Sequence, residues 1–280
     1  MSKLFQRWSS HFLNNQNDEH FELQLQGHEA FVFDCDQTLI HGDIGEACYK
    51  YSLEKRWIIS HDAWWQHLLE ADFKQQEVLS WRKAYEAEYF TPQAPTSLNL
   101  SQELWEAYEH LCLIDTYSAY TYAARVAYRR HPVELALMTE YALQTDQMVR
   151  FRPLMQELTK DLQKLAKVWI VSSSHAAIVR VIAHHYQIPS QHVIGIDFRL
   201  DERQLYTDEL ITPSPVDSKK IDAFKTLYPS QPYLMVGDSK YDLPMMGYAK
   251  SALFINHNKS DHLTQQAQEL NALIIDADLL

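Results

Sequence analysis

Apolar runs of strand type alternate with segments of helical spacing over the second half of the chain. Strands are predicted at 30–34, 168–171, 193–196, 233–236 and 252–255, and helices at 153–165, 178–188 and 219–227. Strands that alternate with helices form parallel sheets with right-handed crossovers. The pattern therefore predicts an α/β fold with a Rossmann-like parallel sheet at its core.

The pattern changes completely between the first strand and the second. Residues 44–149 carry apolar side chains at helical spacings, with Pro92, Pro95 and Pro132 as breaks and no alternating strand pattern. We therefore expect an inserted all-helical domain at 44–149 and an α/β core made of 1–43 and 150–280. Residues 2–15 are expected to form a short helix, 16–27 a polar connector, and 197–211 a short hairpin or an extended excursion.

Composition and charge exclude some classes of partner and indicate where the protein acts. The chain has 280 residues, a formal net charge of -12 and three cysteines in no pairing or metal-binding pattern. The negative field repels polyanions, which argues against nucleic acid as a partner. No apolar stretch spans a membrane and no signal-type segment is visible. Together with the cysteine pattern, this predicts a cytoplasmic protein with no membrane partner. We expect a monomer or homodimer.

Polar side chains follow three of the predicted strands. Asp34 and Asp36 lie two residues apart after the first strand, Ser172 follows the second and Asp238 the fourth. In a parallel sheet these ends share one edge, where ligands bind in open α/β folds. A lysine pair, Lys219-Lys220, precedes a nearby helix. We expect carboxylates, a hydroxyl and an ammonium to converge there.

This set of groups suits metal-assisted phosphoryl transfer. Carboxylate oxygens are ligands for Mg²⁺, which commonly binds one or two protein carboxylates together with substrate phosphate. An aspartate can attack phosphorus, and a second one can protonate the leaving oxygen. A serine at a strand-to-helix junction and a lysine suit phosphate oxygens.

The chain resembles the haloacid dehalogenase-superfamily phosphatases. The motifs that carry the resemblance are Asp34-Cys-Asp36-Gln-Thr38, Ser172, a lysine at 219–220 and Gly237-Asp238-Ser-Lys-Tyr-Asp242. The helical insert resembles the C1-type cap of the phosphoserine phosphatase-like branch. The resemblance implies that Asp34 is the nucleophile and Asp36 the general acid and base. It also implies Mg²⁺ ligands from Asp34, Asp36 (through its backbone carbonyl) and Asp238, with Asp242 supporting them.

The resemblance implies that Ser172 and a lysine contact the phosphate of the substrate. We expect Ser173 and Thr38 to contact the phosphate as well. Both Lys219 and Lys220 are candidates, and Lys220-Ile-Asp-Ala fits the family pattern better. His175 is interpreted as a surface or packing residue, and Cys35 as buried packing on the opposite side of the strand from the two aspartates.

The substrate is less clearly marked. Asp43 and Glu46 are candidate substrate-binding residues, because their segment resembles the same region of phosphorylcholine phosphatases. Alternatively, Glu46 lies in the first turn of a helix, where the helix dipole favours an acid. The aromatic residues of the insert form a helical core, or a few of them form a cage for a quaternary ammonium.

The chain also resembles the phosphoserine phosphatases. Those enzymes usually have two glycines after the motif serine, where this chain has Ser173-Ser174. They also usually have a glutamate at the position of Asp43. The sequence thus predicts a Mg²⁺-dependent phosphomonoesterase for a small phosphorylated metabolite, phosphocholine-like or phosphoserine-like. The alternatives are a catalytically silent binding or scaffold protein with the same fold, and a phosphotransferase.

Overall fold

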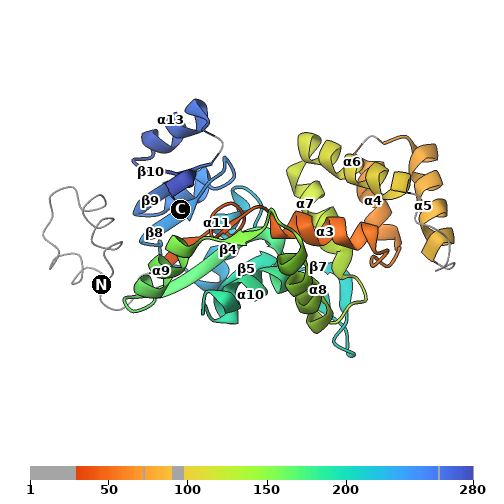
Figure 1. Cartoon of the computed structure of the whole chain (residues 1–280), viewed down its shortest axis with the longest axis horizontal. Helices are drawn as coiled ribbons and strands as arrows, with labels where there is room; N and C mark the ends of the chain where they lie inside the picture. Colours follow the sequence, from red (N-terminus) through yellow and green to blue (C-terminus); the bar gives the residue numbers. More distant parts are fainter. Residues whose placement is uncertain (1–29, 72, 90–97, 258, 280) are drawn as a thin grey trace, which may run out of the picture. The chain divides into compact units, whose positions relative to one another are not determined.

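The computed structural model describes residues 30–71, 73–89, 98–257 and 259–279. Its main sheet has six strands in the order β10-β9-β8-β1-β4-β5 (Figure 1). Every pairing from β10 to β4 is parallel, which confirms the predicted α/β class. The strands are β1 (Ala30–Phe33), β4 (Lys167–His175), β5 (Val193–Ile196), β8 (Leu234–Gly237), β9 (Ser251–Asn256) and β10 (Leu273–Asp276).

Strand β1 lies in the middle of the sheet, between β8 and β4. All four of its residues are buried, as expected for a strand covered on both faces. Phe33 is in register with Val236 on β8 and Ile170 on β4. The backbone N–H of Asp34 still donates to the Val236 carbonyl at 2.8 Å, so the ladder reaches the first catalytic candidate.

Helices connect the strands and cover the sheet. They are α9 (Pro153–Leu162), α10 (Ala176–His185), α11 (Lys219–Leu227), α12 (Leu243–Tyr248) and α13 (Asp261–Glu269). Helices α10 and α11 contact β4, α12 contacts β8 and β9, and α13 contacts β9 and β10. The central strands pack into one buried cluster, whose members include Val32, Val171, Met235, Phe224 and Phe254.

The chain turns sharply after β1. Gln37 adopts φ 55°, and its N–H donates to the Gly42 carbonyl at 3.0 Å. Gly42 adopts φ 84°, and a Cβ there would lie 2.5 Å from the Met148 carbonyl oxygen, so only glycine fits. Short strand β2 (Ile40–His41) then pairs antiparallel with β3 (Arg150–Phe151). This turn holds Asp36 and Thr38 beside the end of β1.

A second compact unit comprises residues 44–146 and 196–211. Its helices are α3 (Ile44–Glu54), α4 (Asp62–Glu70), α5 (Gln75–Tyr89), α6 (Leu98–Ile114), α7 (Thr116–Ala124) and α8 (Pro132–Thr145), with a 3-10 turn, η1 (Arg125–Ala127). Trp64 and Tyr122 stack at 5.4 Å with an interplanar angle of 9°, and Tyr49 and Tyr108 are buried with them. These four aromatic residues are core of the helical unit.

The boundaries of this unit differ from the predicted ones in two places. Residues 147–149 group with the sheet, and the hairpin β6 (Phe198–Leu200) and β7 (Tyr206–Leu210) groups with the helices. The Arg129 N–H donates to the Tyr206 carbonyl at 2.8 Å, and the Tyr206 N–H to the Arg130 carbonyl at 3.0 Å. Main-chain bonds of this kind leave no trace in a hydrophobic pattern.

Several elements match the sequence pattern and others were missed. The predicted hairpin, helix 219–227 and strand 193–196 are present, whereas β4 runs through the three serines to His175. Helices α12 and α13 and strand β10 were not predicted. The expected helix 2–15 and connector 16–27 lie outside the described residues. Within the described part of the chain, no helix is long and apolar enough to cross a bilayer.

Candidate active site

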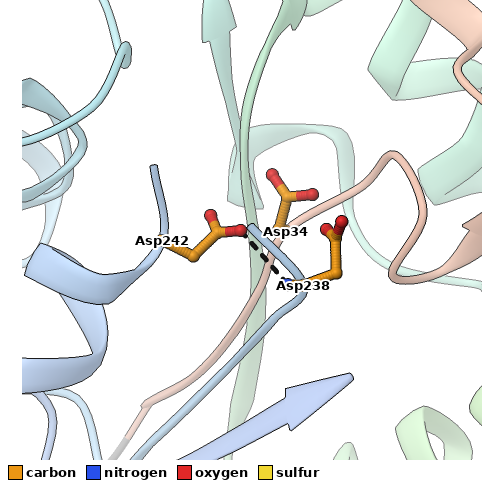
Figure 2. Close-up of side chains that lie close together, drawn as sticks. All are labelled: Asp34, Asp238 and Asp242. Atoms are coloured by element: carbon orange, nitrogen blue, oxygen red, sulfur yellow. Dashed lines mark hydrogen bonds between the residues drawn. The ribbon is translucent and has the colours of Figure 1, made fainter. Parts of the chain in front are cut away.

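Three carboxylates gather at the ends of β1 and β8. Each of Asp34, Asp238 and Asp242 has an oxygen within 4.8 Å of the others, and all three residues are buried. Figure 2 shows Asp34 on its own strand end and Asp238 and Asp242 on the segment after β8. The parallel register of β1 and β8 places these segments side by side, as the sequence predicted for Asp34 and Asp238.

Lys220 lies between two of these carboxylates. Its Nζ is 2.7 Å from Asp34 Oδ1 and 2.6 Å from Asp242 Oδ1, and it is buried. Lys219 is exposed. Because α11 begins at this lysine pair, a one-residue step rotates a side chain by about 100°, which separates the two lysines. The structure therefore places Lys220, rather than Lys219, at the site.

Asp242 is held by its own loop as well as by Lys220. Its Oδ2 accepts from the backbone N–H of Asp238 at 3.2 Å (Figure 2). The same oxygen accepts from the N–H of Ser239 at 3.1 Å and from the Ser239 hydroxyl at 2.8 Å. A Cβ on Gly237 would lie 2.6 Å from the Asp242 Cβ and Cγ. The glycine is therefore required for steric reasons, and Asp242 supports the Asp238 loop.

The charges at this site do not balance. Burial, then the neighbouring Asp242 and Asp36, raise the pKa of Asp34 to about 8, although Lys220 opposes the shift. Burial, then the neighbouring Asp242 and Asp34, raise the pKa of Asp238 well above its ordinary value. Buried acids of like charge are stabilised by a cation. A cluster of carboxylate oxygens fits Mg²⁺, which prefers hard oxygen ligands.

Asp36 lies across from the serines at the end of β4. Its Oδ2 accepts from the Ser174 hydroxyl at 2.8 Å and from the Ser172 hydroxyl at 3.3 Å. Ser172 is buried and Asp36 is half-buried. The structure thus brings Ser172 to the aspartate pair, as the sequence predicted.

The other predicted phosphate contacts have different surroundings. The Thr38 hydroxyl donates to Asp238 Oδ1 at 3.1 Å and so joins the two acidic motifs. The Ser173 hydroxyl donates to the Pro215 carbonyl at 3.0 Å, because alternate residues of a strand face opposite sides. Ser173 is therefore not brought to the carboxylates. Cys35 is buried, and His175 caps α10 by accepting from the Ala177 N–H at 3.1 Å.

Three residues at the site were not predicted. His257 follows β9 directly, and its Nδ1 lies 3.3 Å from Asp238 Oδ2. Because parallel strands end at one edge of the sheet, its position after a predicted strand could have identified it. Arg152 is buried and donates to the carbonyls of Gln37 and Ala277, both at 3.2 Å, so it braces the turn after Asp36. Burial lowers the pKa of Arg152. Ser174 donates to Asp36, and no motif of the sequence marks this contact.

The two substrate-binding candidates fall in different units. Asp43 is the last residue of the first segment of the sheet unit and is half-buried. Glu46 lies in the first turn of α3, and its Oε1 accepts from the Tyr108 hydroxyl at 3.2 Å. Tyr108 is part of the helical core described above. The position of Glu46 in the first turn agrees with the helix-dipole interpretation.

The fold and the acidic site define a hydrolase of the haloacid dehalogenase type. Residues 31–247 match the profile of the haloacid dehalogenase-like hydrolases, and the chain belongs to this family. A comparison with curated protein sequences found no match.

Solved structures share the fold at low sequence identity. A conserved protein of unknown function from Anaerococcus prevotii is 16% identical, with a TM-score of 0.64 over 88% of this chain and 85% of that one. A HAD family hydrolase from Salmonella enterica serovar Typhi is 12% identical, with a TM-score of 0.53 over 99% of this chain and 77% of that one. A phosphoserine phosphatase with a phospho-aspartyl intermediate analogue is 12% identical, with a TM-score of 0.50 over 89% of this chain and 94% of that one.

Proposed function

We propose that the protein is a Mg²⁺-dependent phosphomonoester hydrolase that works through an aspartyl-phosphate intermediate. The observation that carries the proposal is the contact of Lys220 with both Asp34 and Asp242, which joins a strand-end carboxylate to the Asp238 loop. Membership of the hydrolase family supports it. A solved phosphoserine phosphatase shares the fold.

The reaction needs two carboxyl groups with different tasks. A carboxylate oxygen of Asp34 attacks phosphorus, and the bond from phosphorus to the leaving oxygen breaks. Asp36 gives its proton to that oxygen and then takes one from the water that hydrolyses the acyl phosphate. Ser172 and Lys220 hold the phosphoryl oxygens. Once phosphate binds, the Lys220 ammonium would neutralise charge on it as well as on Asp34.

The residues that would hold Mg²⁺ are Asp34, the Asp36 backbone carbonyl and Asp238, with Asp242 orienting the Asp238 loop. Bound Mg²⁺ supplies charge neutralisation at the phosphoryl group. The raised pKa values of Asp34 and Asp238 support this assignment, because burial and then the neighbouring carboxylates disfavour the charged forms, which a bound cation would stabilise.

We propose a small phosphorylated metabolite as substrate, with phosphocholine-like and phosphoserine-like esters as the first to test. The helical unit is proposed to act as a cap, with Asp43 and Glu46 as candidate substrate contacts. The three cysteines, none of which forms a disulfide, support a reducing, cytoplasmic location. We propose that the chain acts without nucleic acid or membrane partners.

The proposal is tested by phosphate release from p-nitrophenyl phosphate, with and without Mg²⁺. The wild-type protein should release phosphate only with Mg²⁺, and Asp34→Asn should abolish turnover without changing the circular dichroism spectrum. The matched control is Asp222→Asn, an exposed acid on α11, which should keep full activity. Full activity in Asp34→Asn would overturn the covalent mechanism.

The same assay distinguishes the other candidates. A broad panel of phosphate esters, including phosphocholine, phosphoethanolamine, phosphoserine, sugar phosphates and nucleotides, identifies the substrate class. No turnover on any of them with Mg²⁺ would favour a binding or scaffold protein. New phosphate esters formed when alcohols are added would favour a phosphotransferase.

A further inference from the structure

Two hydroxyl groups of β4 converge on one oxygen of Asp36. Ser174 Oγ lies 2.8 Å and Ser172 Oγ 3.3 Å from Asp36 Oδ2, and both donate to it. Residues two apart on a strand face the same side, which is why both hydroxyls reach the same carboxyl group. The Ser174 N–H also donates to Ser172 Oγ at 3.0 Å. Ser174 therefore orients Asp36 directly and orients Ser172 through its main chain.

We propose that Ser174 is a positioning residue that fixes the carboxyl group of Asp36 for proton transfer to the leaving group, an inference that rests on the phosphatase function proposed above. The shorter of the two contacts comes from Ser174. Ser172 is also assigned to the phosphoryl group, so its hydroxyl is shared between two tasks. Ser174 has the more exclusive contact with Asp36.

The shared acceptor oxygen assigns roles within the carboxyl group. Because both hydroxyls donate to Oδ2, we assign the transferred proton to Oδ1. When the bond from phosphorus to the leaving oxygen breaks, the Oδ1 proton moves to that oxygen and Asp36 is left as a carboxylate. The serine hydroxyls then donate to a charged acceptor, and such hydrogen bonds are stronger than neutral ones. This additional stabilisation arises only as the negative charge forms on Asp36 in the transition state. It therefore raises the rate of the reaction and does not strengthen substrate binding.

The test compares leaving groups rather than total activity. A leaving oxygen that is weakly basic, as in p-nitrophenyl phosphate, needs little protonation, whereas an alkyl alkoxide needs it fully. Ser174→Ala should lower kcat/KM roughly tenfold or more for an alkyl phosphate and less than about threefold for p-nitrophenyl phosphate, as expected for partial loss of acid catalysis. Across a series of aryl phosphates, kcat/KM should depend more steeply on leaving-group basicity than in the wild type.

A matched control lies on the same strand. Ser173→Ala removes a hydroxyl that donates to the Pro215 carbonyl, and it should leave the leaving-group dependence unchanged. Ser174→Thr keeps a hydroxyl and should restore the wild-type dependence. Inhibition by inorganic phosphate reports phosphate binding, and in Ser174→Ala it should stay within about twofold of wild type, as expected for a group that acts mainly in the transition state.

The outcomes separate this inference from the proposed function. A wild-type protein without phosphate release overturns both. If the wild type is active but Ser174→Ala loses the same factor on every substrate, or matches Ser173→Ala, then Ser174 has only a structural role and the inference fails. If Ser174→Ala does not fold, Ser174→Thr and Ser174→Cys decide: the threonine should keep the wild-type dependence and the weakly donating thiol should steepen it.

Discussion

The ammonium of Lys220 lies 2.6 Å from Asp242 Oδ1, and neither side chain is exposed to solvent. The same ammonium contacts Asp34 at 2.7 Å. Burial opposes the charge on this lysine, but Asp242 and Asp34 together raise its pKa, so it stays protonated. One buried cation thus joins the proposed nucleophile to the residue that supports the Asp238 loop.

Removing this cation should destabilise the protein. We expect Lys220→Met to lower the free energy of unfolding by about 3–5 kcal/mol, because it leaves buried carboxylates without their partner. Urea denaturation measures the loss, and phosphate release should also disappear. Lys219→Met, on the exposed side of α11, should change stability by less than about 0.5 kcal/mol. Equal effects of the two substitutions would contradict the assignment of Lys220.

Asp242 should act on the metal indirectly. Asp242→Ala removes the acceptor for the Asp238 and Ser239 N–H groups, so the Asp238 loop loses its support. We expect the Mg²⁺ concentration for half-maximal activity to rise about 10–100-fold, the range typical of residues that orient metal ligands. Asp242→Asn keeps one acceptor oxygen and should have a smaller effect. A Mg²⁺ dependence unchanged in both variants would show that the loop does not need Asp242.

The absence of a side chain at Gly237 is a steric requirement. Gly237→Ala places a Cβ 2.6 Å from the Asp242 side chain, so Asp242 must shift. We expect a loss of about 1–3 kcal/mol in unfolding free energy, together with weaker Mg²⁺ activation. The control is Gly247→Ala, whose Cβ would meet Leu270 Cδ2 at 3.4 Å, an ordinary contact. Thermal melting that ranks the two variants equally would rule out the steric account.

Two histidines of the helical unit should make stability depend on pH. Burial, then Arg125, lower the pKa of both His61 and His67 to about 4. Arg125 Nε donates to His67 Nε2 at 3.0 Å, which requires a neutral imidazole. A folded pKa below the ordinary 6.5 means that the unfolded chain binds protons first as pH falls. Stability should therefore decrease between pH 6.5 and 4, by about 1–3 kcal/mol after allowance for partial exposure.

Urea denaturation at pH 7 and pH 5, in EDTA, tests this pH effect. His67→Gln keeps an acceptor for Arg125 but does not titrate, so it should lose less stability between the two pH values than the wild type. His262→Gln, an exposed histidine on α13, should lose as much as the wild type. The assignment fails if His67→Gln and the wild type lose the same amount.

Much of the sheet unit could be predicted from local patterns. Strand β5 and helix α11 were predicted with their observed ends, because short apolar runs and helical periodicity are properties of neighbouring residues. The convergence of Asp34 and Asp238 followed from the rule that parallel strands end at one edge. By contrast, α12, α13 and β10 were missed. The hairpin β6–β7 groups with the helices through main-chain hydrogen bonds, which a side-chain pattern does not reveal.

The amino-acid sequence alone determined the fold class, the strand-end aspartates and the family, because these depend on the order and spacing of residue types. The tertiary structure decided which side chains meet. It placed Lys220 rather than Lys219 between Asp34 and Asp242, and turned Ser174 toward Asp36 while Ser173 faces away. Those outcomes depend on helix phase and strand register, which are set by packing between segments far apart in the chain.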